Sequence, residues 1–430
     1  MVDHERRIRR SAKITMQPLL VLAHRLPYPP NRGDKIRSFH LLRWLSERYH
    51  VYLGTFYDDP DDAQYIDVLK PFVKQVYALP LSLPLWRKVQ KTASAVATGQ
   101  PVTLTCFNAS AMHNWVAQTC REIQIESALA ICSSMAPYLM NDGLTLKHRV
   151  IDFIDLDSDK WRQYQSQFRW PMSALYRREH KRLLAYEQQI AQTFDHHFFV
   201  SPQELQLFGS LTAQQYEAKG SVVANGIDSD YYQPCQASCP AAEALHQSLK
   251  HQRFIVFTGT MDATANIESV EWFLEHVWPS VKRDFPDLIF YVVGNKPTTK
   301  VLSWQASGSV VVTGGVADVR PYLQYSQLAV APMRLARGVQ NKVLEAMAMA
   351  KPVSLSQRAA EGLRLPDEQK KRVAISAEQM VESIAELLTK PQLAKKIGET
   401  NRIWVQQKYS WASQLNGLKT IMSGDINDRL

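Results

Sequence analysis

Short apolar runs recur along the first half of the chain, and longer stretches with apolar residues at helical spacing lie between them. Runs of about four to eight residues rich in Val, Ile and Phe are typical of buried strands, whereas a repeat of about 3.6 residues is typical of amphipathic helices. The pattern predicts helices over 35–49 and 171–193. It predicts strands over 17–24, 51–56, 75–79, 127–132, 149–153, 197–200 and 221–224.

A second series with the same alternation follows residue 251. Residues 233–251, between the two series, are rich in Pro, Cys, Ser, Ala and Gln and are interpreted as a linker with an entry helix. The second series predicts strands over 253–257, 288–293, 309–313 and 328–332. It predicts helices over 266–283, 319–324 and 340–350, and a helical end over 378–422 that breaks at 390–391 and at 409–411.

Alternating strands and helices predict an α/β protein with two consecutive Rossmann-like, doubly wound domains, each built on a parallel sheet covered on both faces. The predicted N-terminal domain is 17–232, the linker 233–251 and the C-terminal domain 252–408; residues 1–16 are a basic tail predicted to be disordered. Ligands of such sheets bind at the carboxyl ends of the strands, so the cleft between the domains is the expected site.

Composition narrows the class of ligand. The 430 residues carry a net charge of +9, which suits a partner with phosphate groups: a nucleotide, a nucleic acid or an anionic membrane surface. The five cysteines are scattered, which argues against a disulfide framework and a metal site and favours a reducing cytoplasm. The chain has no apolar run of about 18 residues and no signal-peptide core, although residues 1–16 are basic enough to be drawn to an anionic leaflet.

The segment after the predicted strand 328–332 combines groups that suit a nucleotide diphosphate. Arg337, Gly338, Asn341 and Lys342 lie at or just before a helix start, where free N–H groups and the positive end of the helix dipole favour phosphate. Glu345, one turn later, offers a carboxylate that could accept hydrogen bonds from two ribose hydroxyls. The alternative is a surface ion pair between Lys342 and Glu345, worth about 0–1 kcal/mol.

Two loops of the first domain hold further candidates. Residues 25–35 place Gly33 among prolines and cations, where a ligand can approach the backbone; the alternative is a plain loop between strand and helix. Residues 152–161 hold four acids that could orient a hydroxyl, act as a base or bind a divalent ion. The alternative is helix capping by Asp155 or Asp157 within a solvated loop. The loop 25–35 contains no GxGxxG motif, which argues against nicotinamide or flavin.

Shorter motifs follow other strands. Residues 225–228 predict a tight turn, residues 259–266 offer a glycine and polar backbone that could contact phosphates, and residues 314–319 could lie against a flat base.

The order of all these motifs resembles the two-Rossmann-domain (GT-B) glycosyltransferases, specifically the retaining family four, also called group 1. The resemblance runs from about 19 to 411 and rests on 223–228, 257–262, 343–348 and 351–353. Residues 24–35 and 155–161 resemble a subgroup found in bacterial exopolysaccharide and exosortase-associated loci.

The resemblance implies a donor site for a UDP- or GDP-sugar in the C-terminal domain, an acceptor site in the N-terminal domain, and a helix over 409–430 that crosses back to the N-terminal domain. It implies retention at the anomeric carbon, ribose binding by Glu345, and no metal or other cofactor. The expected donor-binding residues are Gly33, Gly259, Val316, Arg334, Arg337, Gly338, Asn341, Lys342 and Glu345. The expected catalytic residues are Asp155, Asp157 and Lys342, and the expected acceptor-binding residues are Arg25, Arg32 and Lys35.

Two positions depart from the family pattern. Many members place an acid eight positions before the ribose-binding glutamate, where this chain has Arg337. Many also place an Arg and a Lys after the first strand of the donor domain, whereas residues 260–266 here contain no cation. We therefore expect Lys342, Arg337 or Arg334 to neutralise the diphosphate.

The sequence thus predicts a glycosyltransferase of the cytoplasm, or peripheral at the inner face of the membrane, that extends a polysaccharide, lipid-linked oligosaccharide or glycolipid in cell-surface biosynthesis. One alternative is a sugar-nucleotide 2-epimerase, which needs no acceptor. Another is a non-catalytic protein that binds nucleotides or nucleic acid. Because the cations are interspersed with acids and form no stripe with stacking aromatics, no nucleic-acid partner is expected.

Overall fold

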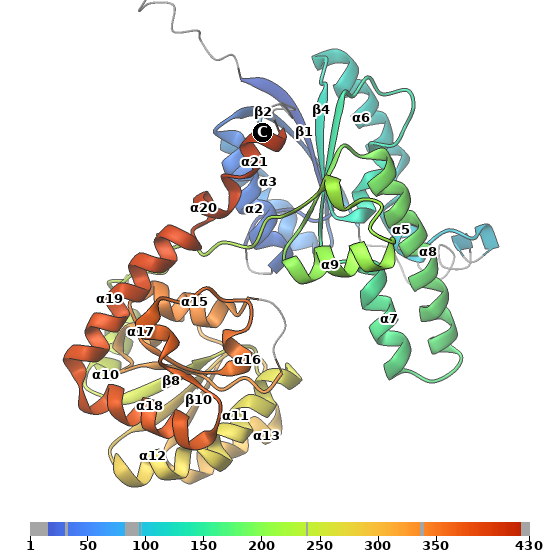
Figure 1. The fold of residues 1–430 in the computed structure, drawn as a ribbon. Helices are drawn as coiled ribbons and strands as arrows, with labels where there is room; N and C mark the ends of the chain where they lie inside the picture. The colour runs from blue at the N-terminus through green and yellow to red at the C-terminus, as the bar shows by residue number, and fades with distance from the viewer. Residues whose placement is uncertain are drawn as a thin grey trace, which may run out of the picture. The chain divides into compact units, whose positions relative to one another are not determined.

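The computed structural model describes residues 16–30, 33–81, 94–95, 97–237, 240–335 and 339–422. The chain divides into two compact units, one formed by residues 1–224 together with 415–430 and the other by residues 225–414 (Figure 1). None of the helices in the described ranges combines the length and the apolar character that crossing a membrane requires.

The first unit is built on a parallel sheet. Its described strands number seven, in the order β3-β2-β1-β4-β5-β6-β7. They are β1 (Gln17–Ala23), β2 (Tyr49–Tyr57), β3 (Gln75–Pro80), β4 (Ser127–Ile131), β5 (His148–Ile154), β6 (His196–Phe199) and β7 (Gly220–Val222). The α-helices are α2 (Gly33–Ser46), α3 (Ile66–Leu69), α5 (Val102–Phe107), α6 (Ser110–Ile123), α7 (Asp157–Gln167), α8 (Met172–Thr193), α9 (Pro202–Leu211) and α21 (Leu418–Met422). Short 3-10 helices are η1 (Pro60–Tyr65), η2 (Lys70–Phe72), η3 (Ser133–Tyr138) and η4 (Glu217–Lys219).

The second unit repeats this plan. Six strands in its described part form a parallel sheet in the order β10-β9-β8-β11-β12-β13. They are β8 (Phe254–Thr258), β9 (Ile289–Val293), β10 (Val310–Gly314), β11 (Ala329–Ala331), β12 (Val353–Ser356) and β13 (Val373–Ala374). The helices are α10 (Pro240–Lys250), α11 (Thr264–His276), α12 (Trp278–Asp284), α13 (Thr299–Ser303), η5 (Trp304–Ser307), α14 (Arg320–Tyr325), α15 (Asn341–Ala348), α16 (Gln357–Ala360), α17 (Asp367–Lys370), α18 (Ala377–Thr389), α19 (Pro391–Lys408) and α20 (Trp411–Leu415).

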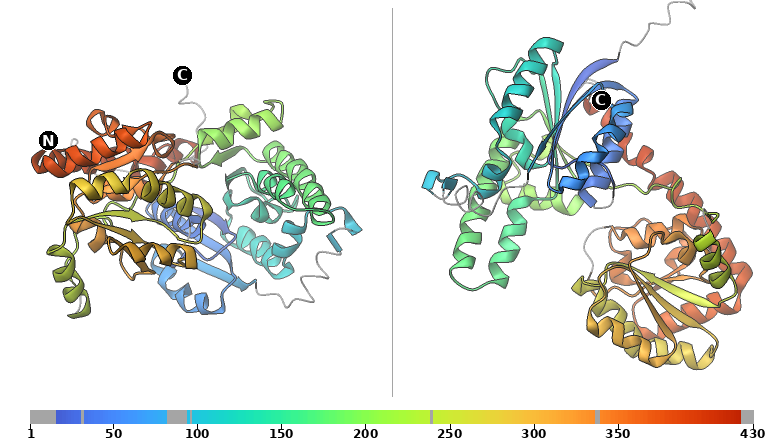
Figure 2. Two further views of the ribbon diagram at one scale, coloured as in Figure 1. Left: turned by 90° about the horizontal axis from the view of Figure 1, so that it is seen from below. Right: turned by 180° about the vertical axis from the view of Figure 1, so that it is seen from behind.

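Burial explains why the central strands are apolar throughout. β1 lies between β2 and β4, with Leu19 opposite Val51 on one side and Ser127 on the other. Every residue of β8 is buried. A strand that has parallel neighbours and helices on both faces of its sheet meets no solvent, so its side chains do not alternate between apolar and polar. Figures 1 and 2 show helices on both faces of each sheet. The predicted α/β class with two doubly wound parallel sheets is confirmed.

The structure differs from several predicted elements. The predicted helix 266–283 is two helices, α11 and α12, because Pro279 lacks the N–H that a continuous helix would use there. The predicted helix 35–49 ends at Ser46, and Tyr49 begins β2. Helices α5 and α6 and strands β12 and β13 were not predicted; β13 has two residues, too few to leave a periodic pattern.

The two units divide between Ala224 and Asn225, whereas the sequence placed the domain boundary at residue 232. The predicted turn at 225–228 is bound to the second unit, because the Ile227 N–H donates to the carbonyl of Tyr409 at 2.6 Å. A Cβ on Gly226 would lie 2.5 Å from the backbone nitrogen of Trp411, so only glycine allows this approach. Residues of α21 belong to the first unit, where the Ile421 carbonyl lies 2.8 Å from Nε2 of His148.

A buried ion pair joins α2 to β5 in the first unit. Arg37 donates from Nε and Nη2 to both carboxylate oxygens of Asp152, at 2.7 and 3.0 Å. Its Nη1 donates to the carbonyl of Val223, just after β7, at 2.7 Å. The side chains of Arg37 and Asp152 are only 2% and 1% exposed, so neither charge has water to replace its partner. Asp152, one of the four acids noted in the sequence, therefore has a structural contact.

We predict that Arg37→Met lowers the free energy of unfolding of the first unit by about 3–5 kcal/mol, because it leaves the Asp152 carboxylate buried without its partner. The double variant Arg37→Met/Asp152→Leu should recover part of this loss. The control is Arg253→Met, which removes a solvent-exposed pair with Asp287 and should cost about 0–1 kcal/mol. Urea unfolding followed by circular dichroism measures all three, and equal losses for Arg37→Met and Arg253→Met would contradict the prediction.

Candidate functional site

The strand order of the second sheet reverses between β8 and β11, which are neighbours although the chain visits β9 and β10 between them. Loops that leave the carboxyl ends of two such strands run in opposite directions and leave space between them, where open α/β sheets bind ligands. In this unit the two loops begin after Thr258 and Ala331. The first turn of α15, which carries the motif singled out in the sequence, lies beside them.

Lys342 is held at this switch point by three contacts. Its Nζ donates to Oδ1 of Asn266 at 2.6 Å, lies 3.5 Å from Sδ of Met333 and sits 4.1 Å from the ring centroid of Phe257. Burial lowers the pKa of Lys342 to about 8, although the nearby carboxylate of Glu345 acts in the opposite direction. The ammonium group is thus largely desolvated, which strengthens its attraction to any anion that enters.

Gly259 makes room for this arrangement. A Cβ at Gly259 would lie 2.8 Å from Nδ2 of Asn266 and 3.1 Å from Nζ of Lys342. The same Nδ2 donates to the carbonyl of Thr260 at 2.8 Å, which fixes the amide so that its oxygen faces Lys342. Asn266 was not among the predicted site residues. The sequence feature that could have identified Asn266 is its position in the first turn of a helix, shortly after the glycine at the end of a strand.

Glu345 lies one turn beyond Lys342 on α15 and meets a different partner. The hydroxyl of Tyr232 donates to its carboxylate, and burial raises the pKa of Glu345 against the opposing effects of Tyr232 and Lys342. Both Glu345 and Lys342 are partly buried, so they do not form the exposed surface pair considered as an alternative. Tyr232 was also missed, because it precedes α10 and is far from α15 in the sequence.

The other predicted donor-binding residues are more exposed or lie elsewhere. Asn341 is exposed at the first residue of α15, and Val316 is partly buried in the loop after β10. The guanidinium carbon of Arg334 lies 5.0 Å from the ring centroid of Trp272. Arg337 and Gly338 lie outside the described residues.

In the first unit, the predicted acceptor-binding cations are engaged with acids. Arg25 donates to Asp34 at 2.6 Å and to Asp58 at 3.0 Å. The ammonium of Lys35 donates to Asp62 at 2.5 Å, and its side chain is only 4% exposed. This ion pair connects α2 to η1, which carries Asp62. Because the ammonium of Lys35 is buried in the pair, it is not available to an acceptor. Arg32 lies outside the described residues.

Gly33 is exposed at the start of α2, and a Cβ there would meet no atom within 4 Å. A side chain would therefore fit at this position in the structure as it stands. The reason that the sequence suggested for a glycine, close approach of a ligand to the backbone, stays a prediction.

The predicted acids Asp155 and Asp157 follow β5. Oδ2 of Asp157 accepts a hydrogen bond from the Ser133 hydroxyl at 2.7 Å, and the Lys160 ammonium lies 3.2 Å from Asp157 and 3.8 Å from Asp155. Ile154, at the end of β5, has a φ of 65°, a conformation that is rare for a β-branched residue and costs about 1–3 kcal/mol. This turn places the acids beside the end of β4, where Ser133 begins η3.

Neither Asp155 nor Asp157 caps helix α7. Leu156 occupies the N-cap position and makes no side-chain cap, and its N–H donates to Glu204 at 3.0 Å. The N–H of Ser158 donates to Glu187 at 3.0 Å. Burial raises the pKa of Glu187 to about 8. The capping alternative is therefore wrong, because carboxylates from α8 and α9 satisfy these groups. Asp155 and Asp157 instead contact Lys160, and Asp157 also accepts from Ser133 and Cys132.

Residues 252–390 match a family described as glycosyl transferases group 1. The chain has no match among curated protein sequences. A glycosyltransferase from Rickettsia africae has a similar structure, with a TM-score of 0.62 and 14% identity over 96% of this chain and 100% of that one. Anabaena Alr3699/HepE in complex with UDP gives a TM-score of 0.60 and 13% identity over 95% and 100% of the two chains.

A Listeria monocytogenes protein described as a UDP-N-acetylglucosamine 2-epimerase also has a similar structure, with a TM-score of 0.54 and 13% identity over 96% of this chain and 98% of that one. At such low identities, these likenesses establish a common fold and do not separate transferase from epimerase. Residues 252–390, within the second unit, thus match the group 1 glycosyl transferase family, and the protein has the two-sheet GT-B fold.

Proposed function

We propose that this protein is a glycosyltransferase that moves a sugar from a UDP- or GDP-sugar to a saccharide or lipid-linked acceptor. The observation that carries the proposal is that a largely desolvated cation, Lys342, and a partly buried carboxylate, Glu345, lie one turn apart at the switch point of the unit that matches the family. Anabaena Alr3699/HepE, with a similar structure, has been solved with UDP and with UDP-glucose. These structures support a nucleotide-sugar as the donor.

The two charged residues suit the two polar parts of such a donor. The Glu345 carboxylate, held by Tyr232, can accept hydrogen bonds from both ribose hydroxyls. The Lys342 ammonium lies beside Gly259, in the loop where residues 260–266 contain no cation, so it can supply the positive charge that this loop lacks. Arg334, in the loop after β11, is a second candidate source of charge. Asn341 adds the N–H groups of the α15 start.

This arrangement can promote departure of the nucleotide. As the bond between the anomeric carbon and the phosphate oxygen breaks, its electron pair moves to the β-phosphate, and the anomeric carbon gains oxocarbenium character. The Lys342 ammonium stabilises that charge more in the transition state than in the ground state, because the charge on the leaving oxygen grows. An acceptor hydroxyl oxygen then bonds to the anomeric carbon, and its proton passes to the departing phosphate oxygen. We propose retention of configuration at this carbon.

Asp155 and Asp157 remain our candidates for contact with the acceptor hydroxyl. Asp157 is oriented by Ser133 and Lys160, while the side chain of Asp155 is 44% exposed and thus open to a ligand.

We place the reaction in cell-surface or exopolysaccharide biosynthesis at the cytoplasmic side of the membrane. That it needs no cofactor stays a prediction. The competing activity is 2-epimerisation of a sugar nucleotide, favoured by the similar structure of the Listeria protein.

A ligand screen followed by product analysis tests the proposal. A nucleotide-sugar that binds the native state raises the unfolding temperature, so UDP-, GDP- and ADP-sugars can be ranked by thermal shift. The ranked donors are then incubated with saccharide and lipid-linked acceptors, and the products are analysed by mass spectrometry and NMR. Formation of an epimerised sugar nucleotide without acceptor would replace the transferase proposal by the epimerase. Absence of any thermal shift would count against both activities.

We predict that Glu345→Gln weakens UDP binding about 10- to 100-fold, because a neutral amide loses charge-assisted hydrogen bonds worth about 1.5–3 kcal/mol. The substitution keeps the size of the side chain and its contact with Tyr232. Glu361→Gln, which removes an exposed carboxylate of the same unit, is the matched control and should bind UDP as the wild type does. Titration calorimetry measures all three, and unchanged affinity in Glu345→Gln would exclude Glu345 as the ribose ligand.

We further predict that affinity for UDP falls as the pH rises through about 8. The pKa of Lys342 is lowered from 10.5 to about 8, so above that pH the free protein must take up a proton before the ammonium can meet the diphosphate. The loss should approach ten-fold for each pH unit above the pKa. Lys342→Met should bind UDP more weakly at pH 7 and should lack this slope.

Calorimetry between pH 7 and about 9, in buffers of different ionisation enthalpy, measures both the affinity and the proton uptake of this linkage. Lys342→Met also reveals any pH dependence that comes from the nucleotide itself. Parallel slopes for the wild type and Lys342→Met would show that Lys342 does not contact the diphosphate.

A further inference from the structure

Helices α7 and α8 of the first unit form a hairpin (Figure 1). The turn between them exposes large apolar side chains. Trp170 is 82% exposed and Phe168 50% exposed, and Tyr164 and Met172 beside them are also exposed. Protein surfaces commonly expose single apolar residues, but a cluster of large apolar side chains marks a surface that binds a protein, a ligand or a membrane. The hairpin turn is therefore a candidate interaction surface.

Ring contacts fix the shape of this turn. The ring of Phe168 packs edge-on against Tyr176 at 5.3 Å, and Tyr164 lies 6.1 Å from the same ring. Trp161 closes the group at 5.4 Å from Tyr176. Aromatic rings held by one another lose little conformational freedom when they bind a partner, so the surface is preorganised.

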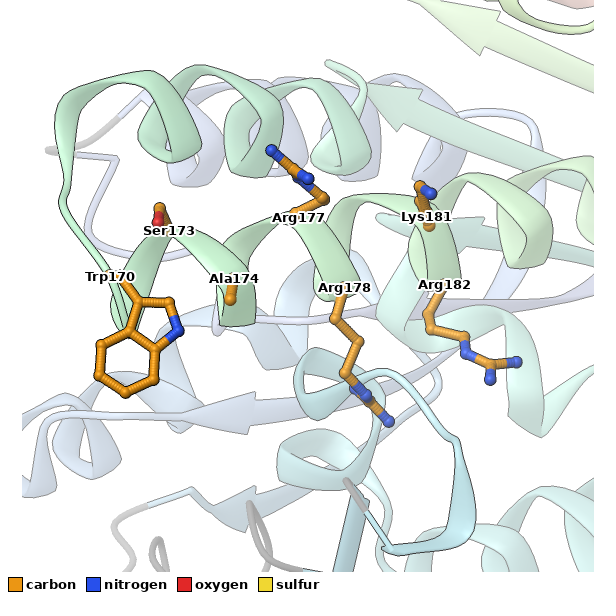
Figure 3. A pocket seen from close by; sticks show the side chains of 7 residues that line it. All are labelled: Trp170, Ser173, Ala174, Arg177, Arg178, Lys181 and Arg182. Carbon is orange, nitrogen blue, oxygen red and sulfur yellow. The ribbon is translucent and has the colours of Figure 1, made fainter.

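A basic pocket of about 480 Å³ lies next to the turn, along the first half of α8. Its lining includes Trp170, Ser173, Arg177, Arg178, Lys181 and Arg182 (Figure 3). The cations repeat at intervals of four, 178 with 182 and 177 with 181, so they form two adjacent rows of the helix. In Figure 3, Trp170, Arg178 and Arg182 reach to one side of α8 and Arg177 and Lys181 to the other, so cations surround the helix next to the turn.

Both acids of α8 are buried within the first unit, and Oε2 of Glu179 lies 3.7 Å from Nη1 of Arg178, so the net charge of the pocket rests on Arg177, Lys181 and Arg182. Glu179 accepts hydrogen bonds from the N–H groups of Val102 and Thr103, each at 3.0 Å, and Glu187 accepts from Ser158. Arg178 is tied to the backbone, since its Nη2 donates to the Ala95 carbonyl at 2.8 Å. The side chains that α8 presents to solvent around the pocket therefore carry net positive charge.

We propose that this face of the α7–α8 hairpin docks on the surface of an anionic phospholipid bilayer. Arg177 to Arg182 lie about 8–15 Å along the helix from Met172, at 1.5 Å per residue, and the headgroup region of one leaflet is about 5–8 Å thick. Aromatic rings that enter the interface by about 5–10 Å would bring these cations level with lipid phosphates. Each Lys or Arg held near an anionic surface strengthens binding by about five-fold.

The positions of the cations and of the aromatic rings together favour a phospholipid bilayer over a single-stranded nucleic acid. Stacking sites for bases need ring faces interleaved with the cations, whereas here the clustered rings lie at the hairpin turn and the cations lie behind them on α8. The proposed membrane-binding surface thus lies on α7 and α8, whereas the sequence suggested residues 1–16. It does not depend on the donor chemistry proposed for the second unit.

Co-sedimentation of the full chain with vesicles tests this proposal. Vesicles of phosphatidylcholine and phosphatidylglycerol should bind the protein, and vesicles of phosphatidylcholine alone should bind it at least ~10-fold more weakly. Arg177→Glu/Lys181→Glu should lower the partition coefficient on anionic vesicles by at least ~10-fold. Trp170→Ala, which leaves the net charge unchanged, should lower it by about three-fold or more.

The matched control is Lys395→Glu/Lys396→Glu, which makes the same change of net charge at exposed positions of α19 and should stay within about two-fold of the wild type. All substituted residues are exposed, so unfolding temperatures should match that of the wild type. Equal loss in the two charge-reversal variants, or wild-type binding in Trp170→Ala, would overturn the proposal. So would binding of single-stranded DNA that is tighter than vesicle binding and is lost with Arg177→Glu/Lys181→Glu.

Discussion

The reversal of strand order beside β8 is the constraint on which the candidate donor site depends. Parallel strands require crossover connections, and where the direction of winding changes, the loops of two neighbouring strands separate and leave their carboxyl ends uncovered. Polar groups placed there can face a ligand and still be supported by the sheet. Lys342 illustrates this, because its ammonium contacts Asn266 from α11, Met333 from the loop after β11 and Phe257 from β8.

The first unit has the same architecture, but different side chains lie at the ends of its strands. Its strand ends bring together Asp157, Ser133 and Lys160, and the helix that follows is supported from behind by Glu187 and Glu204. The buried pair of Arg37 and Asp152 connects α2, β5 and the end of β7 beneath these loops. The buried charges that support the fold are thus satisfied by contacts within the unit. The charged side chains that remain at the strand ends are those that a ligand could contact.

Long periodic elements and the α/β class were predictable from the sequence, because a buried parallel strand such as β8 must be apolar on both faces. Contacts between distant segments were not. Lys35 looked like a free cation in a loop, but Asp62 neutralises it from η1, and no local pattern reports that pairing. Glu187 had a usable signal, since it shares a helix row with Leu183 and Ile190, where an acid must find an internal partner.

The return of residues 415–422 to the first unit has a consequence for the order of synthesis. Leu418 and Met422 are buried there, and the Ile421 carbonyl meets His148, yet these residues leave the ribosome only after the whole second unit. The first unit therefore starts to form early but gains its last buried side chains late. Until then, the surface that α21 covers stays open to solvent or to chaperones, whereas the second unit, continuous from 225 to 414, can complete its own core beforehand.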